Sequence, residues 1–217
     1  FKRKHMNIIV DRFNKIKSNI SNNSANIIAV SKTFPIEHVM PLINAGHNHF
    51  GENKVQEAEY KWLEEKSKNR NIKLHMVGKL QSNKVKKAVE LFDYIHSLDN
   101  QKLAETLSKF EKIKKKKLKY FIQVNIGREK QKSGIYPEQL DDFFSYCTTK
   151  LDLNIVGLMT LPPNDGKEEL YFKSLYEMNI SLGLNDLSMG MSSDYIKALK
   201  YKATYLRIGS SIFGKRT

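Results

Sequence analysis

The hydrophobic positions of the chain alternate between the period of a helix and that of a strand. The first segment repeats apolar residues at the spacing of a helix with one buried face: Ile9, Phe13, Ile16 and Ile20. The β-branched run at 27–30 is typical of a strand buried on both faces of a parallel sheet. Pro35 suits the first turn of the helix that follows, and Gly46 marks its end.

The same alternation continues to the end of the chain. Further strands are predicted at 47–50, 73–77, 93–96, 119–125, 154–158, 184–188 and 204–208. Helical patterns lie between most of them, so the chain holds eight βα units of the α/β class. Eight units favour a closed (β/α)₈ TIM barrel with an extra N-terminal helix, and an open doubly wound sheet is the alternative.

No internal repeat and no linker rich in Pro, Gly or Ser divides the chain. We therefore expect a single domain over residues 1–217, in which residues 1–24 form the N-terminal helix packed on the barrel. No apolar run approaches the roughly 18 residues of a membrane span, so we expect no membrane partner. The single cysteine, Cys147, is expected in the core and excludes an internal disulfide, which favours a reducing, cytoplasmic location.

The charge of the chain is strongly positive. Its 217 residues include 37 Lys and Arg against 23 Asp and Glu, a net charge of +14. Such a surplus suits nucleic acid or a phosphorylated ligand. The densest run, 112–119, contains no aromatic residue for base stacking, so a solvated loop is the favoured interpretation and we expect no nucleic-acid partner.

Polar clusters follow the predicted strands, where a barrel of this kind places its reactive groups. Loop and capping roles are the favoured interpretation for Ser82, Ser97 and Thr160 taken singly. The clusters 190–192 and 209–211 follow the last two strands, and their glycines allow backbone N–H groups to approach an anion. Because barrels often hold phosphate there, the sequence predicts a phosphate-bearing ligand.

Two cationic residues extend this prediction. Lys32 follows the buried strand 27–30, where apolar surroundings lower the pKa of an amine and prepare it to attack an aldehyde. Position alone equally allows Lys32 to extend into water. Arg207 ends the last strand, which neighbours the first in a closed barrel, and its planar donors can face a flat heteroaromatic ring. Aldehyde, ring nitrogen and phosphate together describe pyridoxal 5′-phosphate (PLP).

Six ordered blocks of the chain resemble one family, the pyridoxal phosphate homeostasis proteins, also called proline synthase co-transcribed homologues. The blocks are 29–33, 50–57, 78–84, 123–129, 187–192 and 207–210. The resemblance implies a barrel like the N-terminal domain of alanine racemase, with PLP bound as an internal aldimine. It implies the following cofactor-binding residues: Lys32 as the Schiff-base lysine, Arg207 as the partner of the pyridine nitrogen, Ser192, Gly209 and Ser210 as the phosphate cradle, and Asn53 beside the cofactor.

Three residues depart from the family pattern. Phe34 and Lys79 stand where the family often has Lys and His, and Ser210 stands where Thr is common. None of them is expected to touch the bond to Lys32, whereas Lys79 bears on the charge of the pocket.

The arginine partner favours a carrier over an enzyme. A guanidinium stays protonated, so the pyridine nitrogen beside it holds no proton and the ring is a weaker electron sink. Related racemases supply a second acid–base residue from an added domain, and no residue here is assigned to that role. We therefore expect no catalytic residue and no metal, but a monomer that serves vitamin B6 homeostasis and delivers PLP to apo-enzymes. A PLP-dependent amino-acid racemase or decarboxylase of the barrel type is the alternative, and a basic nucleic-acid-binding module is third.

Overall fold

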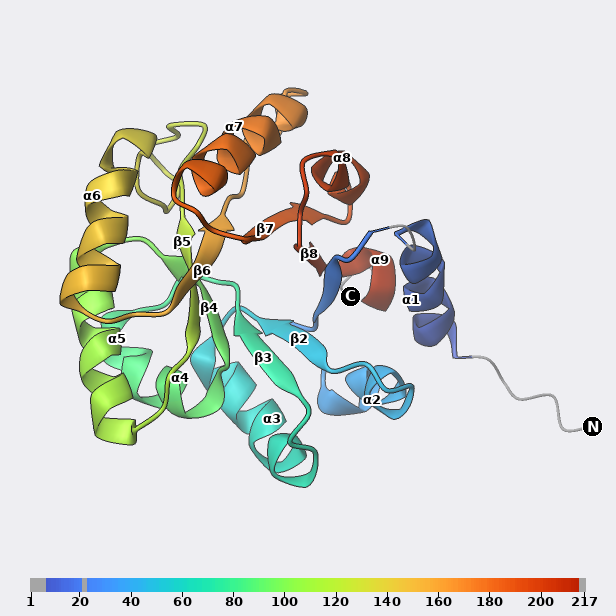
Figure 1. Ribbon diagram of the computed structural model, residues 1–217. Helices are drawn as coiled ribbons and strands as arrows, with labels where there is room; N and C mark the ends of the chain where they lie inside the picture. Colours follow the sequence, from blue (N-terminus) through green and yellow to red (C-terminus); the bar gives the residue numbers. More distant parts are fainter. Residues whose placement is uncertain (1–6, 21–22, 215–217) are drawn as a thin grey trace, which may run out of the picture.

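Eight parallel strands close into a barrel in chain order (Figure 1). The computed structural model describes residues 7–20 and 23–214. The strands are β1 (Asn26–Val30), β2 (His49–Glu52), β3 (Lys73–Met76), β4 (Tyr94–Leu98), β5 (Lys119–Gln123), β6 (Ile155–Met159), β7 (Asp186–Met191) and β8 (Tyr205–Ile208). Because β1 pairs with both β2 and β8, the predicted (β/α)₈ TIM barrel is confirmed and the open sheet is wrong.

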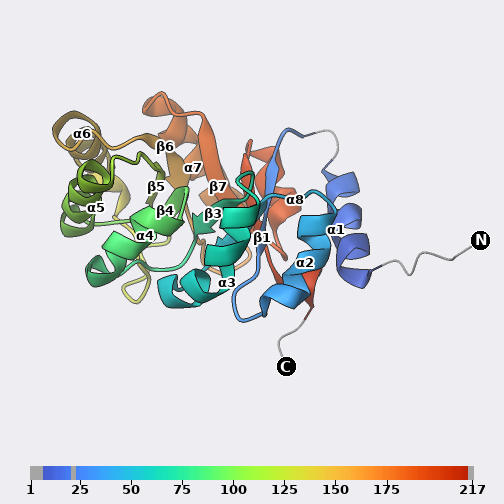
Figure 2. The same ribbon diagram turned by 90° about the horizontal axis from the view of Figure 1, so that it is seen from below.

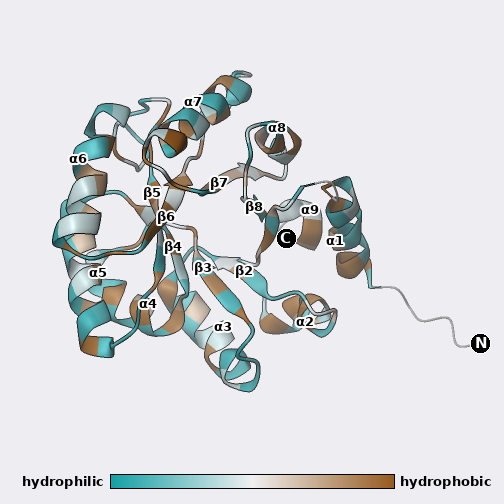
Figure 3. Ribbon diagram, viewed as in Figure 1, coloured by the Kyte–Doolittle hydropathy of each residue, from teal (hydrophilic) through white to brown (hydrophobic). Residues whose placement is uncertain are grey.

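Helices surround the strands and alternate apolar with polar stretches, as expected for elements with one buried face (Figure 3). They are α1 (Ile8–Asn19), α2 (Ile36–Asn44), α3 (Val55–Lys68), α4 (Val85–Leu91), α5 (Gln101–Lys114), α6 (Leu140–Ser145), α7 (Glu168–Ser181), α8 (Tyr195–Lys200) and α9 (Ser210–Phe213). Shorter helical turns are η1 (Ser82–Lys84), η2 (Pro137–Gln139) and η3 (Tyr146–Lys150). The extra helix α1 packs on α2 and α9, beside which it lies in Figures 1 and 2.

The core has two layers, one inside the barrel and one between barrel and helices. The inner cluster consists of Ile28, Val30, Tyr94, Phe121, Met159 and Tyr205. In β1, Ile28 and Val30 join this inner cluster, whereas Ile27 and Ala29 join the outer one, as the alternation of a strand requires. The inward series of β1 thus leads directly towards Lys32.

Most predicted strands differ from the structure by one or two residues at an end, and three predicted elements differ more. The strand predicted at 47–50 is β2 (His49–Glu52), since the charged Glu52 is buried among partners that the apolar pattern did not reveal. The strand predicted at 184–188 is β7 (Asp186–Met191). Of the N-terminal helix predicted at 1–24, the structure shows Ile8–Asn19, and residues 1–6 and 21–22 lie outside the described residues. Cys147 is buried as expected, although in the π-helical turn η3, and burial raises the pKa of its thiol to about 12.

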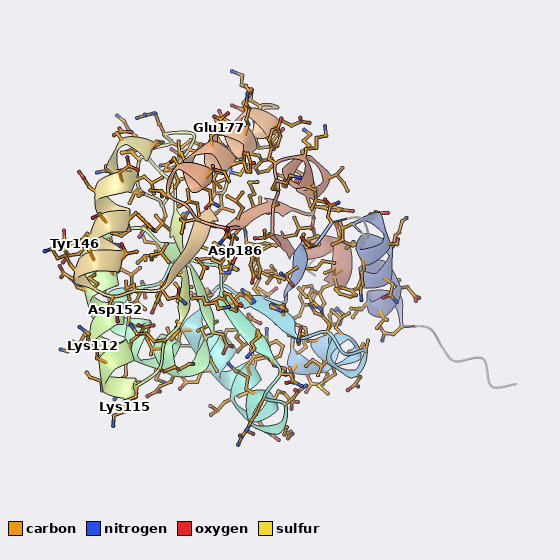
Figure 4. The ribbon with its side chains drawn as sticks, in the orientation of Figure 1. Lys112, Lys115, Tyr146, Asp152, Glu177 and Asp186 are labelled. Atoms are coloured by element: carbon orange, nitrogen blue, oxygen red, sulfur yellow. The ribbon has the colours of Figure 1, made fainter. Side chains whose placement is uncertain are left out.

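The basic run lies on the outer surface, where Figure 4 shows Lys112 and Lys115 at the edge of the molecule. Its first part is the last turn of α5 and not a loop. Lys116 caps carbonyl groups of Glu90 and Phe92 at 3.0 and 2.8 Å, and Lys117 pairs with Asp152 at 2.7 Å. Part of the run is therefore engaged with the protein itself. Within residues 7–20 and 23–214, no helix combines the length and the apolar character needed to cross a bilayer.

Candidate functional site

A cavity of about 600 Å³ lies where several barrel strands end. All six residues predicted to bind a cofactor line it: Lys32, Asn53, Ser192, Arg207, Gly209 and Ser210. They come from the ends of β1, β2, β7 and β8, which the closure of the barrel brings together. Val30, Val77 and Leu161 complete the wall with apolar surface, which sequence analysis did not assign to the site.

The charge of the cavity wall is positive. Its described lining residues include Lys32 and Arg207 and no Asp or Glu. Arg207 is buried, and this burial lowers the pKa of its guanidinium to about 10, so the group remains protonated at neutral pH. The arrangement therefore favours an anionic ligand.

The loops after β7 and β8 are joined at the predicted phosphate cradle. The Ser211 N–H, in α9, donates to the Ser192 Oγ at 3.3 Å. Gly190 has φ +92°, and a Cβ there would lie 2.8 Å from that of Ala198, so only glycine fits. Ser192 and Ser210, one from each of these joined loops, both line the cavity.

The turn that carries Lys32 is held from both sides. The Ser31 hydroxyl donates to Glu52 Oε1 at 2.7 Å, and Lys61 Nζ donates to the Ser31 carbonyl at 2.8 Å. The backbone N–H of Thr33 donates to the Glu57 carboxylate. Thr33 has φ +71°, a left-handed conformation that is strained for a β-branched residue. Residues of β2 and α3 therefore fix a strained turn and, with it, the starting point of the Lys32 side chain.

Glu52 is the centre of this support. It is fully buried, and its Oε1 accepts hydrogen bonds from Lys61 Nζ at 2.8 Å and from Trp62 Nε1 at 3.0 Å. Its Oε2 has no hydrogen-bond partner among the described residues. A buried carboxylate of this kind depends on its cation, so removal of Lys61 is expected to destabilise the fold.

Two of the three departures from the family pattern, Phe34 and Lys79, have different surroundings. Phe34 lines the cavity and stacks on His38, with ring centroids 4.8 Å apart, and its ring lies 5.4 Å from that of Phe213. It thus gives the cavity an aromatic edge. Lys79 is exposed and does not line the cavity, so its charge is not part of the cavity wall.

Sequence analysis missed a row of polar side chains inside the barrel. His49, His75 and His96 lie on β2, β3 and β4, and the row continues through Ser188 to Arg207. Burial lowers the pKa of all three histidines, for His75 and His96 well below the usual 6.5. In the sequence, each of these histidines is a polar residue at an inward position of a predicted strand. Such a residue does not indicate a contact until it is known which strands pair.

Acid is expected to destabilise the fold through its buried histidines. Burial also lowers the pKa of His47 to about 4, so the unfolded chain, with a pKa near 6.5, binds more protons below that pH. The contribution to stability is therefore complete above about pH 6.5 and is lost as the pH falls. Between pH 6.5 and 5, His47 alone is expected to remove about 2 kcal/mol from the free energy of unfolding.

Urea denaturation at several pH values between 7.5 and 5 tests this expectation, and His47→Asn should flatten the pH dependence. Equal free energies of unfolding at pH 7.5 and pH 5 in the wild type would contradict it.

Comparison with known proteins places the chain in a family. The model of the alanine racemase N-terminal domain matches residues 5–217. The pyridoxal phosphate homeostasis protein of Haemophilus influenzae is 36% identical over 210 residues, which are 92% of this chain and 89% of that protein. Its counterpart from Aquifex aeolicus is 37% identical over 203 residues, 89% of this chain and 88% of that protein.

Solved structures give the same result. PipY of Synechococcus elongatus with PLP bound has a TM-score of 0.86 and 34% identity, covering 95% of this chain and 100% of PipY. An alanine racemase of Clostridium difficile has a TM-score of 0.77 at 13% identity, covers 96% of this chain and 57% of its own, and shows a shared fold alone. The chain therefore belongs to the family of pyridoxal phosphate homeostasis proteins, which are built on the alanine racemase N-terminal domain.

Proposed function

We propose that this chain binds PLP in the cavity at the ends of β1, β7 and β8 and serves vitamin B6 homeostasis as a carrier. One observation supports this most directly: a single cavity combines an amine, a buried guanidinium and three serines, with no carboxylate among its described lining residues. The names of the relatives and the PLP-bound structure of PipY point to the same ligand.

The donor set fits this cofactor group by group. Bound PLP supplies an aldehyde that reacts with amines and a ring that can withdraw electrons. In the proposal, Lys32 would bond the aldehyde carbon, whose oxygen leaves as water, Arg207 would face the ring nitrogen, and Asn53 would lie beside the ring. Ser192, Gly209 and Ser210 hold the phosphate, because hydroxyls and a backbone free of a side chain suit its oxygens.

A carrier role is favoured over an enzyme. The relatives of 36–37% identity are named as homeostasis proteins, whereas the racemase is similar only in fold. Arg207 is a donor that stays protonated, so it keeps the ring nitrogen free of a proton and weakens carbanion chemistry. The same proposal includes a single domain over residues 1–217, a monomer, a cytoplasmic location and apo PLP-dependent enzymes as clients.

Reduction with borohydride tests which residue bonds the cofactor. The full chain is incubated with PLP, reduced, digested and analysed by mass spectrometry. We expect the added mass on one peptide, at Lys32, because only this lysine lines the cavity among the described residues. Protein reduced without PLP is the control. Label spread over the surface lysines, or no label, would contradict the proposal.

The loaded protein is also incubated with D- and L-amino acids. Stoichiometric change or none is expected of a carrier, whereas steady turnover would establish the racemase or decarboxylase alternative.

A further inference from the structure

Three histidines of consecutive strands form a hydrogen-bonded row inside the barrel. His49 Nδ1 lies 2.9 Å from His75 Nε2, and His75 Nδ1 lies 2.9 Å from His96 Nε2. His49 is the first residue of β2, and His75 is level with Gly51, two residues further along. His96 is in turn two residues beyond Tyr94, which is level with His75. The row therefore climbs from the amino ends of the strands towards their carboxyl ends.

The row then crosses the barrel to the cavity. His96 Nδ1 lies 2.8 Å from the Ser188 Oγ, which accepts a hydrogen bond from Arg207 Nη1 at 2.6 Å. Since β4 and β7 are not neighbours in the barrel, this link passes through its interior. Arg207 Nη2 donates to the Thr160 carbonyl at 2.7 Å, and Arg207 lines the cavity. One continuous chain of hydrogen bonds thus joins the half-exposed His49 to the ligand site.

The direction of this chain follows from the chemistry of its ends. A guanidinium only donates hydrogen bonds, so the Ser188 oxygen accepts from Arg207. The Ser188 side chain is fully buried, and among the described residues its hydroxyl contacts two side-chain nitrogens, Arg207 Nη1 and His96 Nδ1. Its hydrogen must therefore point to His96 Nδ1, because the reverse arrangement would leave a buried O–H without an acceptor.

The tautomers of the histidines are then determined in turn. A neutral imidazole carries one hydrogen, so His96 holds it on Nε2 and donates to His75 Nδ1. By the same step His75 holds its hydrogen on Nε2 and donates to His49 Nδ1. Burial, complete for His75 and His96 and partial for His49, lowers the pKa of each ring below the usual 6.5, so all three are neutral at pH 7.5. The charge of Arg207 further disfavours a second proton on His96.

Charged groups other than Arg207 act on the lower two histidines of the row, and Lys66 is the one that acts on His75. Lys73, Asp93 and Lys119 act on His49, and Tyr94 and Tyr205 pack against the rings. None of these groups contacts the Ser188 hydroxyl. No group of three or more His, Cys, Asp or Glu in the described part of the chain has the arrangement of a metal site, so the row is not a metal centre.

We propose that Ser188, His96, His75 and His49 form a one-directional chain that positions Arg207, with every hydrogen directed away from the cavity. Such a chain presents only acceptors to the guanidinium and leaves its remaining donors for the ligand. Ser188 and His96 are thus positioning residues for Arg207. The direction of the hydrogen-bond chain can be tested in the protein without PLP. The effect of the chain on PLP binding, in contrast, rests on the proposed function.

The tautomers can be read directly. In ¹⁵N-labelled full-length protein without ligand, long-range ¹H–¹⁵N correlations at pH 7.5 distinguish Nε2–H from Nδ1–H rings. Single substitutions such as His49→Gln assign the signals. We expect Nε2–H at His49, His75 and His96. A hydrogen on Nδ1 of His75 or His96 would overturn the proposal. If these residues only filled space in the core, neither the Nε2–H nor the Nδ1–H tautomer would be required.

Ser188→Ala provides the second arm. It removes the link between His96 and Arg207 without adding volume. The ring of His96 is expected to lose its preference for Nε2–H, and PLP affinity to fall about tenfold or more, as for a lost hydrogen bond to a charged group. His47→Asn, at a half-buried histidine whose side chain is not part of the hydrogen-bond chain, should leave both the tautomers and the affinity unchanged.

Two measurements on the wild-type protein, the histidine tautomers and the PLP affinity, distinguish failure of the proposed function from failure of the positioning role. Wild-type protein that shows the expected tautomers but binds no PLP would refute the proposed function and leave the chain direction intact. Unchanged affinity and an unchanged His96 tautomer in Ser188→Ala would refute the positioning role itself.

Discussion

Replacing Lys32 with alanine is expected to abolish covalent attachment of PLP to the protein. Lys32 continues the inward series of β1 and is the lysine that lines the cavity among its described residues. The amine that bonds the aldehyde is then gone, and so is one of the two cations of the wall. Loss of one charged donor to an anionic ligand alone should weaken affinity roughly 10- to 100-fold.

Visible absorbance after gel filtration, together with equilibrium dialysis, measures both effects. Lys54→Ala is the matched control, since Lys54 also follows a barrel strand but is exposed and does not line the cavity. It removes the same charge and should retain the absorbance of the wild type. Absorbance that persists in Lys32→Ala, or that disappears equally in Lys54→Ala, would refute the assignment of Lys32.

Lys61→Met is expected to lower the free energy of unfolding by about 3–5 kcal/mol, the usual result when one partner of a buried ion pair is removed. Glu52 is fully buried, and Lys61 Nζ lies 2.8 Å from its Oε1 with a side chain only 5% exposed. Without Lys61 the carboxylate is left without its cation, and the carbonyl of Ser31 loses a donor. Urea denaturation of wild type and variant at pH 7.5 measures the difference.

The same helix provides a control for this substitution. Lys68 pairs with Glu64 at 2.5 Å, but the two side chains are 58% and 77% exposed. Lys68→Met should therefore lower stability far less than Lys61→Met does, because water and salt screen an exposed pair. The double variant Lys61→Met with Glu52→Gln should regain part of the loss, because no uncompensated charge remains buried. Equal losses in Lys61→Met and Lys68→Met would show that the buried cluster does not depend on its ion pair.

The barrel could be predicted because each strand is short, apolar and separated from the next by a helical pattern. The cavity residues could be predicted because closure places the ends of the first and last strands together, so Lys32 and Arg207 are neighbours whatever the details of packing. The resemblance added the individual roles in binding, which await the experiments above.

The polar interior could not be predicted, because its residues are meaningful only as pairs. In the sequence, Glu52 is only a polar residue at the end of a strand. Its role becomes visible when the structure places Lys61 and Trp62 of α3 beside it. Likewise His75 and His96 read as isolated polar residues in buried strands, since their partners lie on other strands. Polar side chains that form hydrogen bonds with residues of distant elements leave no periodic pattern in the sequence.

The site lies at the seam where β1 meets β8, with Lys32 near the start of the chain and Arg207, Gly209 and Ser210 near its end. During synthesis, a nascent chain that lacks the last strand therefore holds the amine and Ser192, but neither the guanidinium nor the Gly209 and Ser210 part of the cradle. Ligand capture must follow closure of the seam, and any ligand that binds only the closed state stabilises the closed state in proportion to the logarithm of its concentration. Occupancy would then report that biosynthesis of the barrel is complete.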